Sequence, residues 1–275
     1  MGTRWGEGPV WLPAVRRLRW SDIPNDRILE YDAGTGRTTA YREDAGFANG
    51  RTLDLDGAVV ECSHGRRAVE RDDGAGPVTV VDSWQGRRLN SPNDVVVAAD
   101  GAIWFTDPPY GILSDKQGHV APPEYGGCHV FRFDEHTGRL DAVVTDMIHP
   151  NGLAFSPDGR VLYVSDTSVL HLPDGHRHIR AYDVVGGRCG NGRVLAEIRP
   201  GCPDGFRVDE RGRIWTSSGD GVRVLAPDGS VVGAVAVAEA VSNVCFGGDD
   251  GRDLYITGAT SLYRIRTATR AAARG

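Results

Sequence analysis

Short apolar runs alternate with polar turns along this chain, in a unit that recurs six times. Each unit begins at a small polar residue, runs through an apolar stretch to a second position seven residues later, and returns in another apolar stretch. In five units that second position is polar and is followed by Gly, a pair that favours a tight hairpin turn, whereas the first unit has Ala14-Val15. We call the starting positions the register residues: Glu7, Asn49, Asn93, Asn151, Asp204 and Asn243.

The returning stretches predict β-strands, because Val, Ile, aromatic residues and Thr dominate them and Gly, Pro or Asp bounds them. These strands are expected at 18–22, 58–62, 103–107, 162–166, 214–218 and 254–258. A third strand is expected in most units, at 27–32, 129–134, 179–183 and 262–266. No long segment has a helical period.

Successive register residues are 42 (7 to 49), 44 (49 to 93), 58 (93 to 151), 53 (151 to 204) and 39 (204 to 243) positions apart. Hairpins repeated at such a period are typical of propeller blades. The sequence therefore predicts an all-β protein, a six-bladed β-propeller that forms a single domain over 1–275. If the units are equivalent, the six register residues point at one axis.

The two longest units carry insertions at 108–127 and 168–178, which we expect as loops on one face, where specificity usually resides. Closure of the ring is the irregular feature, because only six residues precede Glu7. We expect the last blade to keep three strands and an open edge, unless residues after Ile265 supply a fourth. An open edge is a weak indication of a homodimer, and the chain is expected to be a monomer or a homodimer.

Composition narrows the range of partners. A net charge of −6 and a pI near 5.7 argue against nucleic acid and anionic membranes, which need a basic surface. There is no apolar leader and no apolar stretch long enough to span a membrane. The five cysteines are odd in number and widely spaced, with no C-x-x-C pair, so reduced thiols in a cytoplasmic protein are expected.

Four register residues offer the oxygen ligands that a hard cation prefers: Glu7, Asn93, Asn151 and Asp204. Two carboxylates and two neutral amides also balance a divalent charge inside a channel. Calcium is the expected metal, with magnesium, manganese and zinc as alternatives. Asn and Asp before Gly are ordinary turn formers, but six copies in register favour a shared functional position.

Three further histidines, His171, His176 and His178, suggest a softer transition metal. They lie in the second insertion, on either side of a Pro-Asp-Gly turn, and we do not expect a specific zinc site there.

Several strings in this chain resemble, in order and over nearly its whole length, the SMP-30/gluconolactonase/LRE-like family. They are 7–11 (EGPVW), 21–24 (SDIP), 88–94 (RLNSPND), 104–111 (WFTDPPYG), 150–153 (PNGL), 203–205 (PDG) and 254–257 (LYIT). The resemblance implies a six-bladed propeller with one divalent metal, usually calcium, in its channel. It places the metal ligands at Glu7, Asn151 and Asp204, with Asn93 as a fourth or near contact.

The resemblance also implies hydrolysis of a small lactone, which we expect to be sugar-derived, and the residue chemistry agrees with it. A cation on the carbonyl oxygen stabilises the developing oxyanion, while Asp204 takes a proton from the attacking water. Direct activation of water by the metal is the alternative.

Substrate contacts are expected from five residues near strand ends and at the start of the first insertion: Asn90, Asp94, His64, Asp107 and Tyr110. Structural roles compete with these assignments: His64 alone fits a hydrogen-bonded core histidine, and Asp107 and Asp166 fit turn caps. Some relatives have Arg where this chain has Ser91, so the substrate preference of the family does not transfer.

Two other functions remain open: hydrolysis of other activated esters or organophosphates, and small-molecule binding without catalysis. A Gly-x-Ser-x-Gly nucleophile motif is absent from the sequence, and no cysteine carries a nucleophile signature. The intact set of oxygen ligands favours an enzyme, because a binding protein has no need of an open metal position.

Overall fold

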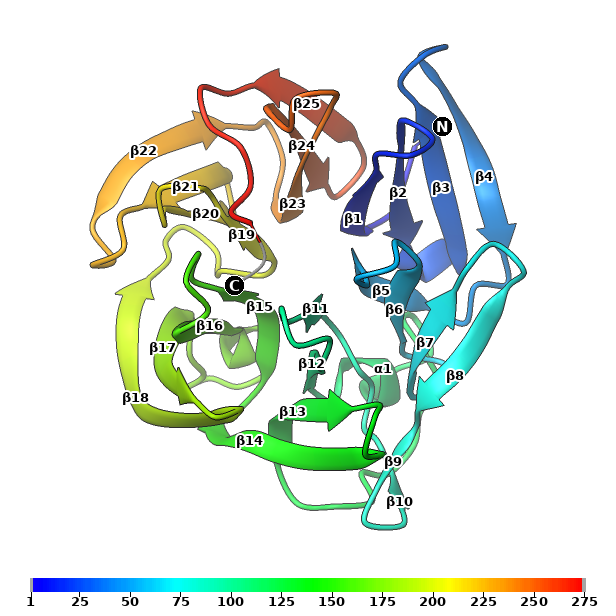
Figure 1. Cartoon of the computed structure of the whole chain (residues 1–275), viewed down its shortest axis with the longest axis vertical. Coiled ribbons are helices and arrows are strands. Elements are labelled where there is room, and N and C mark those ends of the chain that lie inside the picture. Colours follow the sequence, from blue (N-terminus) through cyan, green and yellow to red (C-terminus); the bar gives the residue numbers. More distant parts are fainter. Residues whose placement is uncertain (1, 274–275) are drawn as a thin grey trace.

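The computed structural model describes residues 2–273, in which six antiparallel sheets, the blades, follow one another in chain order around a central channel and a small two-stranded sheet lies outside them (Figure 1). The predicted six-bladed β-propeller is confirmed. In each blade the first strand lies beside the channel and the later strands lie progressively farther out.

The first three blades have four strands each. Blade 1 contains β1 (Gly6–Leu12), β2 (Arg17–Asp22), β3 (Arg27–Asp32) and β4 (Arg37–Glu43). Blade 2 contains β5 (Ala48–Leu53), β6 (Val59–Ser63), β7 (Ala68–Asp72) and β8 (Pro77–Val81). Blade 3 contains β11 (Val95–Val97), β12 (Ile103–Asp107), β13 (Cys128–Asp134) and β14 (Arg139–Met147).

Blades 4 and 5 also have four strands, whereas blade 6 has three. Blade 4 contains β15 (Pro150–Phe155), β16 (Val161–Asp166), β17 (His178–Val185) and β18 (Arg188–Glu197). Blade 5 contains β19 (Phe206–Val208), β20 (Ile214–Ser218), β21 (Gly221–Leu225) and β22 (Val231–Ala236). Blade 6 contains only β23 (Val241–Gly247), β24 (Asp253–Gly258) and β25 (Leu262–Arg266).

Short elements occupy the connections: β9 (Ser83–Trp84), β10 (Arg87–Arg88), the helix α1 (Tyr110–Leu113), and the 3₁₀ turns Ile23–Asn25 and Ser168–Leu170. Both predicted insertions thus contain a single helical turn, and neither adds a strand to its blade.

Apolar clusters fill the spaces between successive blades. One cluster joins Val60 and Cys62 of blade 2 to Ile103, Phe105 and Phe131 of blade 3, and similar clusters join the later pairs of blades. A strand in this position is covered on both faces, which explains why the predicted strands have nearly continuous apolar sequences. Each large side chain buried in this way contributes about 1.5–3 kcal/mol to stability.

A glycine follows most register residues because neighbouring blades approach closely around the channel. A Cβ on Gly8, whose φ is +51°, would lie 2.0 Å from the backbone oxygen of Asn49. At Gly152 a Cβ would lie 2.4 Å from the oxygen of Asp204, and the Gly152 N–H donates a 3.1 Å hydrogen bond to that oxygen. Only Gly permits this contact, which ties one register residue to the next.

The ring closes without a fourth strand in blade 6. Residues after Ile265 run to blade 5 instead, where the Ala272 N–H donates a 2.9 Å hydrogen bond to the carbonyl of Val208. Blades 6 and 1 join through side chains, including Trp11 stacked on Tyr255 at 5.6 Å. The outer edge of β25 therefore has no paired strand within residues 2–273.

All five cysteines are free thiols. Among residues 2–273, no helix has both the length and the apolar character to span a membrane.

Candidate metal and active site in the channel

A cavity of about 360 Å³ opens at one mouth of the channel. Five register residues and both insertions form its walls together with apolar residues. The lining residues are Trp5, Glu7, Ile23, Asn49, Asn93, Tyr110, Leu113, Ser114, Lys116, Gln117, Asn151, Leu170, His171 and Asp204. Larger hollows of about 500 and 670 Å³ lie between outer strands, away from the register residues.

Two carboxylates face one another across this cavity without a cationic partner. Glu7 is 4% exposed, and one of its oxygens accepts hydrogen bonds from the Gly8 N–H at 2.7 Å and from Asn243 Nδ2 at 3.1 Å. Burial raises the pKa of Glu7, and burial together with the nearby Glu7 charge raises the pKa of Asp204. Within residues 2–273, neither carboxylate forms an ion pair with Arg, Lys or His.

Amide oxygens complete the donor set. Asn151 lines the cavity, donates from Nδ2 to Thr167 Oγ1 at 3.1 Å, and its side chain also forms a hydrogen bond with the Asp204 carboxylate. Asn93 also lines the cavity, and its backbone N–H bonds to the Thr106 carbonyl at 2.9 Å. The four predicted metal ligands therefore line the same cavity. Two carboxylates beside neutral amide oxygens fit a hard divalent cation.

His64 fixes the orientation of Asn49. Its Nδ1 lies 3.0 Å from the carbonyl oxygen of Gln117, so Nδ1 must carry the proton. Burial lowers the pKa of His64 to about 4, which makes the ring neutral and Nε2 an acceptor. Nε2 then accepts from Asn49 Nδ2 at 3.1 Å, so the free oxygen of Asn49 faces the cavity that it lines.

Asn243 is also a register residue, but its side-chain amide is turned into the protein and not toward the cavity. Its Oδ1 accepts the Val244 N–H at 2.8 Å and its Nδ2 donates to Glu7. Both ends of the amide are occupied inside the protein, and Asn243 does not line the cavity. Asn243 positions Glu7, whereas Asn49 presents an acceptor to the cavity.

The sequence of this chain also matches a known protein family. The family described as the SMP-30/Gluconolactonase/LRE-like region matches residues 5–260. This chain belongs to that family. The resemblance inferred from the sequence strings is confirmed over nearly the full chain.

Family relatives cover the chain almost completely. Gluconolactonase of Zymomonas mobilis is 32% identical over 97% of this chain and 79% of its own length. Pentonolactonase XacC of Haloferax volcanii is 33% identical over 93% of this chain and 82% of its own. A solved gluconolactonase structure from Xanthomonas campestris is 38% identical, covers 96% of this chain and 86% of its own, and superposes with a TM-score of 0.89.

Of the five substrate contacts predicted for this family member, only Tyr110 lines the cavity. Its hydroxyl is hydrogen-bonded to Thr167 Oγ1, the group that also holds Asn151. His64 lies behind Asn49, one layer away from the cavity. Asp94 lies deeper in the channel, 3.5 Å from Arg207 Nη1.

Asn90 and Asp107 hold the first insertion in place. Asp107 accepts the N–H groups of Asn90 and Ser91 at 2.7 and 2.8 Å and the hydroxyl of Tyr125. Asn90 donates from Nδ2 to the carbonyl of Gly127 at 3.2 Å. These contacts place both side chains in a buried network outside the cavity lining.

Sequence reasoning missed several lining residues of the insertions, among them Leu113, Lys116 and Gln117, and it named His171 only as a candidate metal ligand. Lys116 is exposed and is the only lysine of the chain. The expectation that both insertions emerge on one face was the signal that pointed to these loops, but it named none of their side chains.

Proposed function

We propose that this chain hydrolyses a sugar-derived lactone to its hydroxy acid, with a divalent cation held in the channel. The observation that carries the proposal is the pair Glu7 and Asp204, two carboxylates without a cationic partner on the wall of an open cavity. The names of the relatives, gluconolactonase and pentonolactonase, support the substrate class.

Glu7, Asn151 and Asp204 would hold the cation, with Asn93 as a fourth or near contact. Calcium suits this all-oxygen set better than a softer metal does, and two carboxylates would neutralise its charge. When bound, the cation supplies Lewis-acid stabilisation of the negative charge that develops on the lactone carbonyl oxygen.

Asp204 acts as the general base. Its carboxylate takes a proton from a water molecule as the water oxygen bonds to the lactone carbonyl carbon. The tetrahedral adduct then collapses, the ring C–O bond breaks, and the leaving alkoxide oxygen receives the proton. In the metal-free chain, burial and the charge of Glu7 raise the pKa of Asp204. A bound cation would lower it again and so keep the carboxylate ionised and able to accept the proton.

Substrate hydroxyls bind to the groups that the cavity presents. Asn49 offers an oxygen acceptor that His64 holds in place, so it suits a hydroxyl donor. Tyr110 and Lys116 line the same cavity from the first insertion. The apolar faces of Trp5, Ile23 and Leu170 cover the rest, which leaves a space of about 360 Å³ for a small ring.

A lactone panel tests this function. Acid release is measured on aldonolactones, simple lactones, aryl esters and a phosphotriester, for wild type with and without chelator and for Asp204→Asn. We expect the highest kcat/KM on an aldonolactone, loss of turnover with chelator, and recovery when Ca²⁺ is restored. Turnover that survives chelation contradicts the metal requirement, and activity only on aryl esters or phosphotriesters contradicts the substrate class. Cation binding without turnover on any substrate contradicts catalysis.

A further inference from the structure

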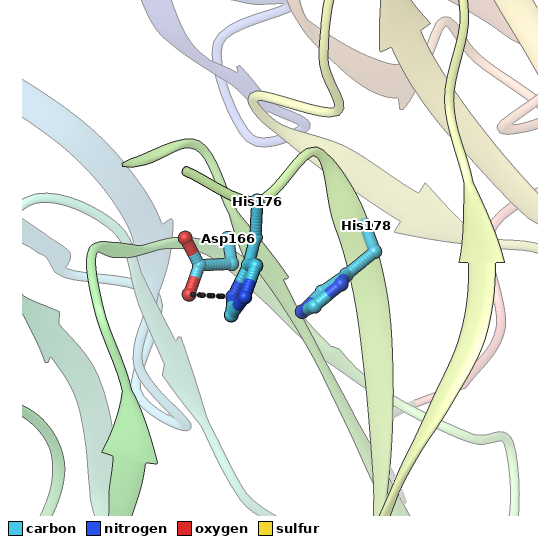
Figure 2. Close-up of side chains that lie close together, drawn as sticks. All are labelled: Asp166, His176 and His178. Carbon is cyan, nitrogen blue, oxygen red and sulfur yellow. Dashed lines mark ion pairs between the residues drawn. The ribbon is translucent and has the colours of Figure 1, made fainter. Parts of the chain in front are cut away.

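Blade 4 brings together three side chains that the channel site does not use. Asp166 ends β16, His178 begins β17 as its register partner, and His176 comes from the insertion between them. Figure 2 shows the two rings side by side with the Asp166 carboxylate next to His176. One ligand atom from each residue lies within 4.8 Å of the others, and the His176 and His178 rings stack at 4.5 Å.

One nitrogen of each imidazole in this cluster lacks a hydrogen-bond partner among residues 2–273. Within residues 2–273, His176 Nδ1 and His178 Nε2 are buried atoms without a hydrogen bond, and His178 as a whole is 7% exposed. His176 Nδ1 lies 3.5 Å from an Asp166 oxygen, an ion-pair contact when the ring is protonated but longer than an ordinary hydrogen bond, and the His176 side chain is 41% exposed. A buried polar atom without a partner costs about 1–3 kcal/mol. A ligand bound by His176 Nδ1 and His178 Nε2 would remove this cost.

Backbone hydrogen bonds hold the Asp166 carboxylate in place. It accepts the N–H of Ser168 at 3.0 Å and the N–H of Ile148 at 2.9 Å. The His178 ring is buried nearby. A neutral imidazole and an ionised carboxylate are the forms that bind metals.

Blade 3 offers a natural comparison at the same place. There Asp107 ends β12 and His129 pairs with it across the sheet, as Asp166 pairs with His178. The third position differs: Tyr125 stacks on His129 at 5.5 Å and donates its hydroxyl to Asp107. Within residues 2–273, His129 Nδ1 also lacks a hydrogen-bond partner. In blade 3 the Tyr125 hydroxyl hydrogen-bonds the Asp107 carboxylate. In blade 4 the His176 imidazole takes the place of that phenol beside Asp166.

We propose that Asp166, His176 and His178 form a second metal site, specific for a borderline transition metal such as Zn²⁺. Two imidazoles and one carboxylate leave a fourth position for water, the arrangement that Zn²⁺ accepts. The ligand set separates this site from the channel, where the donors are all oxygen and favour a hard cation. Small side-chain movements would bring the three atoms to coordination distance.

Binding there would fasten the second insertion to the blade. Two ligands flank Arg177, and a third lies on β16, so a bound ion would close the loop from Asp166 to His178. Leu170 and His171 lie within this loop and line the channel cavity. The second site would therefore fix one part of the cavity rim without touching the channel cation.

Cobalt spectroscopy tests the site. The full chain is stripped with chelator, given excess Ca²⁺ to occupy the channel, and titrated with Co²⁺, whose visible absorption reports four-coordinate nitrogen ligands. We expect one Co²⁺ per chain, displaced by Zn²⁺. His176→Tyr, which copies blade 3, should weaken this binding by more than about 100-fold, because loss of a ligand exceeds the 10–100-fold cost of losing an outer partner. Glu7→Gln should leave it unchanged.

Two results overturn the proposal: no saturable Co²⁺ or Zn²⁺ binding above Ca²⁺ in the wild type, or equal affinity in His176→Tyr. His178→Gln serves as a second variant, with circular dichroism to establish that each folds. Trypsin cleavage after Arg177 gives an independent measure. Zn²⁺ should slow it at least about tenfold in wild type and not in His176→Tyr, and equal cleavage with and without Zn²⁺ contradicts the site.

Discussion

Buried carboxylates at two places in this propeller have opposite surroundings. Away from the cavity they meet arginine: Glu61 lies between Arg42 and Arg51, and Asp209 pairs with Arg213 Nε at 2.7 Å. At the cavity Glu7 and Asp204 have amides and one another as neighbours. In the first region arginines form ion pairs with the carboxylates, whereas among residues 2–273 Glu7 and Asp204 have no ion pair and only the more distant charge of Arg207 acts on Glu7.

The difference indicates what the channel is built to hold. Two like charges without a cation would repel and would favour protonation, as the raised pKa values of Glu7 and Asp204 show. A divalent cation removes that repulsion. The missing arginine is therefore a feature of the site, since an internal cation would occupy the position that the metal and the substrate need.

The largest effect is expected for Asp204→Asn. The amide cannot accept the proton of the attacking water, so kcat/KM on the preferred lactone should fall by at least about 100-fold. Thermal unfolding of the metal-free variant should show no loss of stability, because a repelled charge is removed. Asp158→Asn makes the same chemical change at an exposed hairpin turn and should leave kcat/KM within about twofold. Full activity in Asp204→Asn would rule out its assignment as the base.

Glu61→Gln and Glu7→Gln test the contrast in surroundings directly. Glu61→Gln leaves Arg51 buried without its partner and should lower the free energy of unfolding by about 3–5 kcal/mol. Glu7→Gln should not destabilise the metal-free protein, but it should weaken Ca²⁺ binding. Denaturant unfolding with chelator measures both, and equal destabilisation by the two variants would remove the distinction.

His64→Leu tests the orientation of Asn49. Without the ring acceptor the amide is free to turn, and a substrate hydroxyl loses a fixed partner worth about 0.5–1.5 kcal/mol. KM should rise roughly threefold to tenfold, with little change in kcat. His129→Leu removes another buried histidine, outside the cavity, and should leave KM unchanged. A fall in kcat alone for His64→Leu would point to a different role.

The smallest effect concerns pH. The folded pKa values of Glu7 and Asp204 are raised, so in metal-free protein these groups contribute stability below their unfolded values, near 4.5 and 3.8. That contribution is lost as pH rises toward the folded pKa values. The difference in melting temperature between wild type and Glu7→Gln, measured with chelator, should therefore widen in favour of the variant above about pH 4.5. A difference that stays constant with pH would contradict the raised pKa of Glu7.

Local pattern was sufficient to predict the blades. The returning strand predicted at 103–107 is β12, and that at 162–166 is β16 with one residue more. Such strands are fixed by apolar runs and turn residues that lie next to one another in the chain. The register residues also came from local pattern, and five of them line one cavity.

The local sequence pattern could not predict contacts between segments that lie far apart in the chain. The role of Asn49 depends on His64 and on the carbonyl of Gln117, which comes from an insertion more than fifty residues later. Asp166 joins His176 and His178 only because β16 and β17 pair in register. The sequence suggested His171 as the third member, which instead lines the cavity.

Calorimetric titration with Ca²⁺ tests the central claim most directly. Chelator-stripped wild type should bind one Ca²⁺ per chain, while Glu7→Gln and Asp204→Asn should each bind it far more weakly and His176→Tyr should bind it as the wild type does. Absence of Ca²⁺ binding in the wild type, or unchanged affinity in both carboxylate variants, would contradict a cation site built on Glu7 and Asp204.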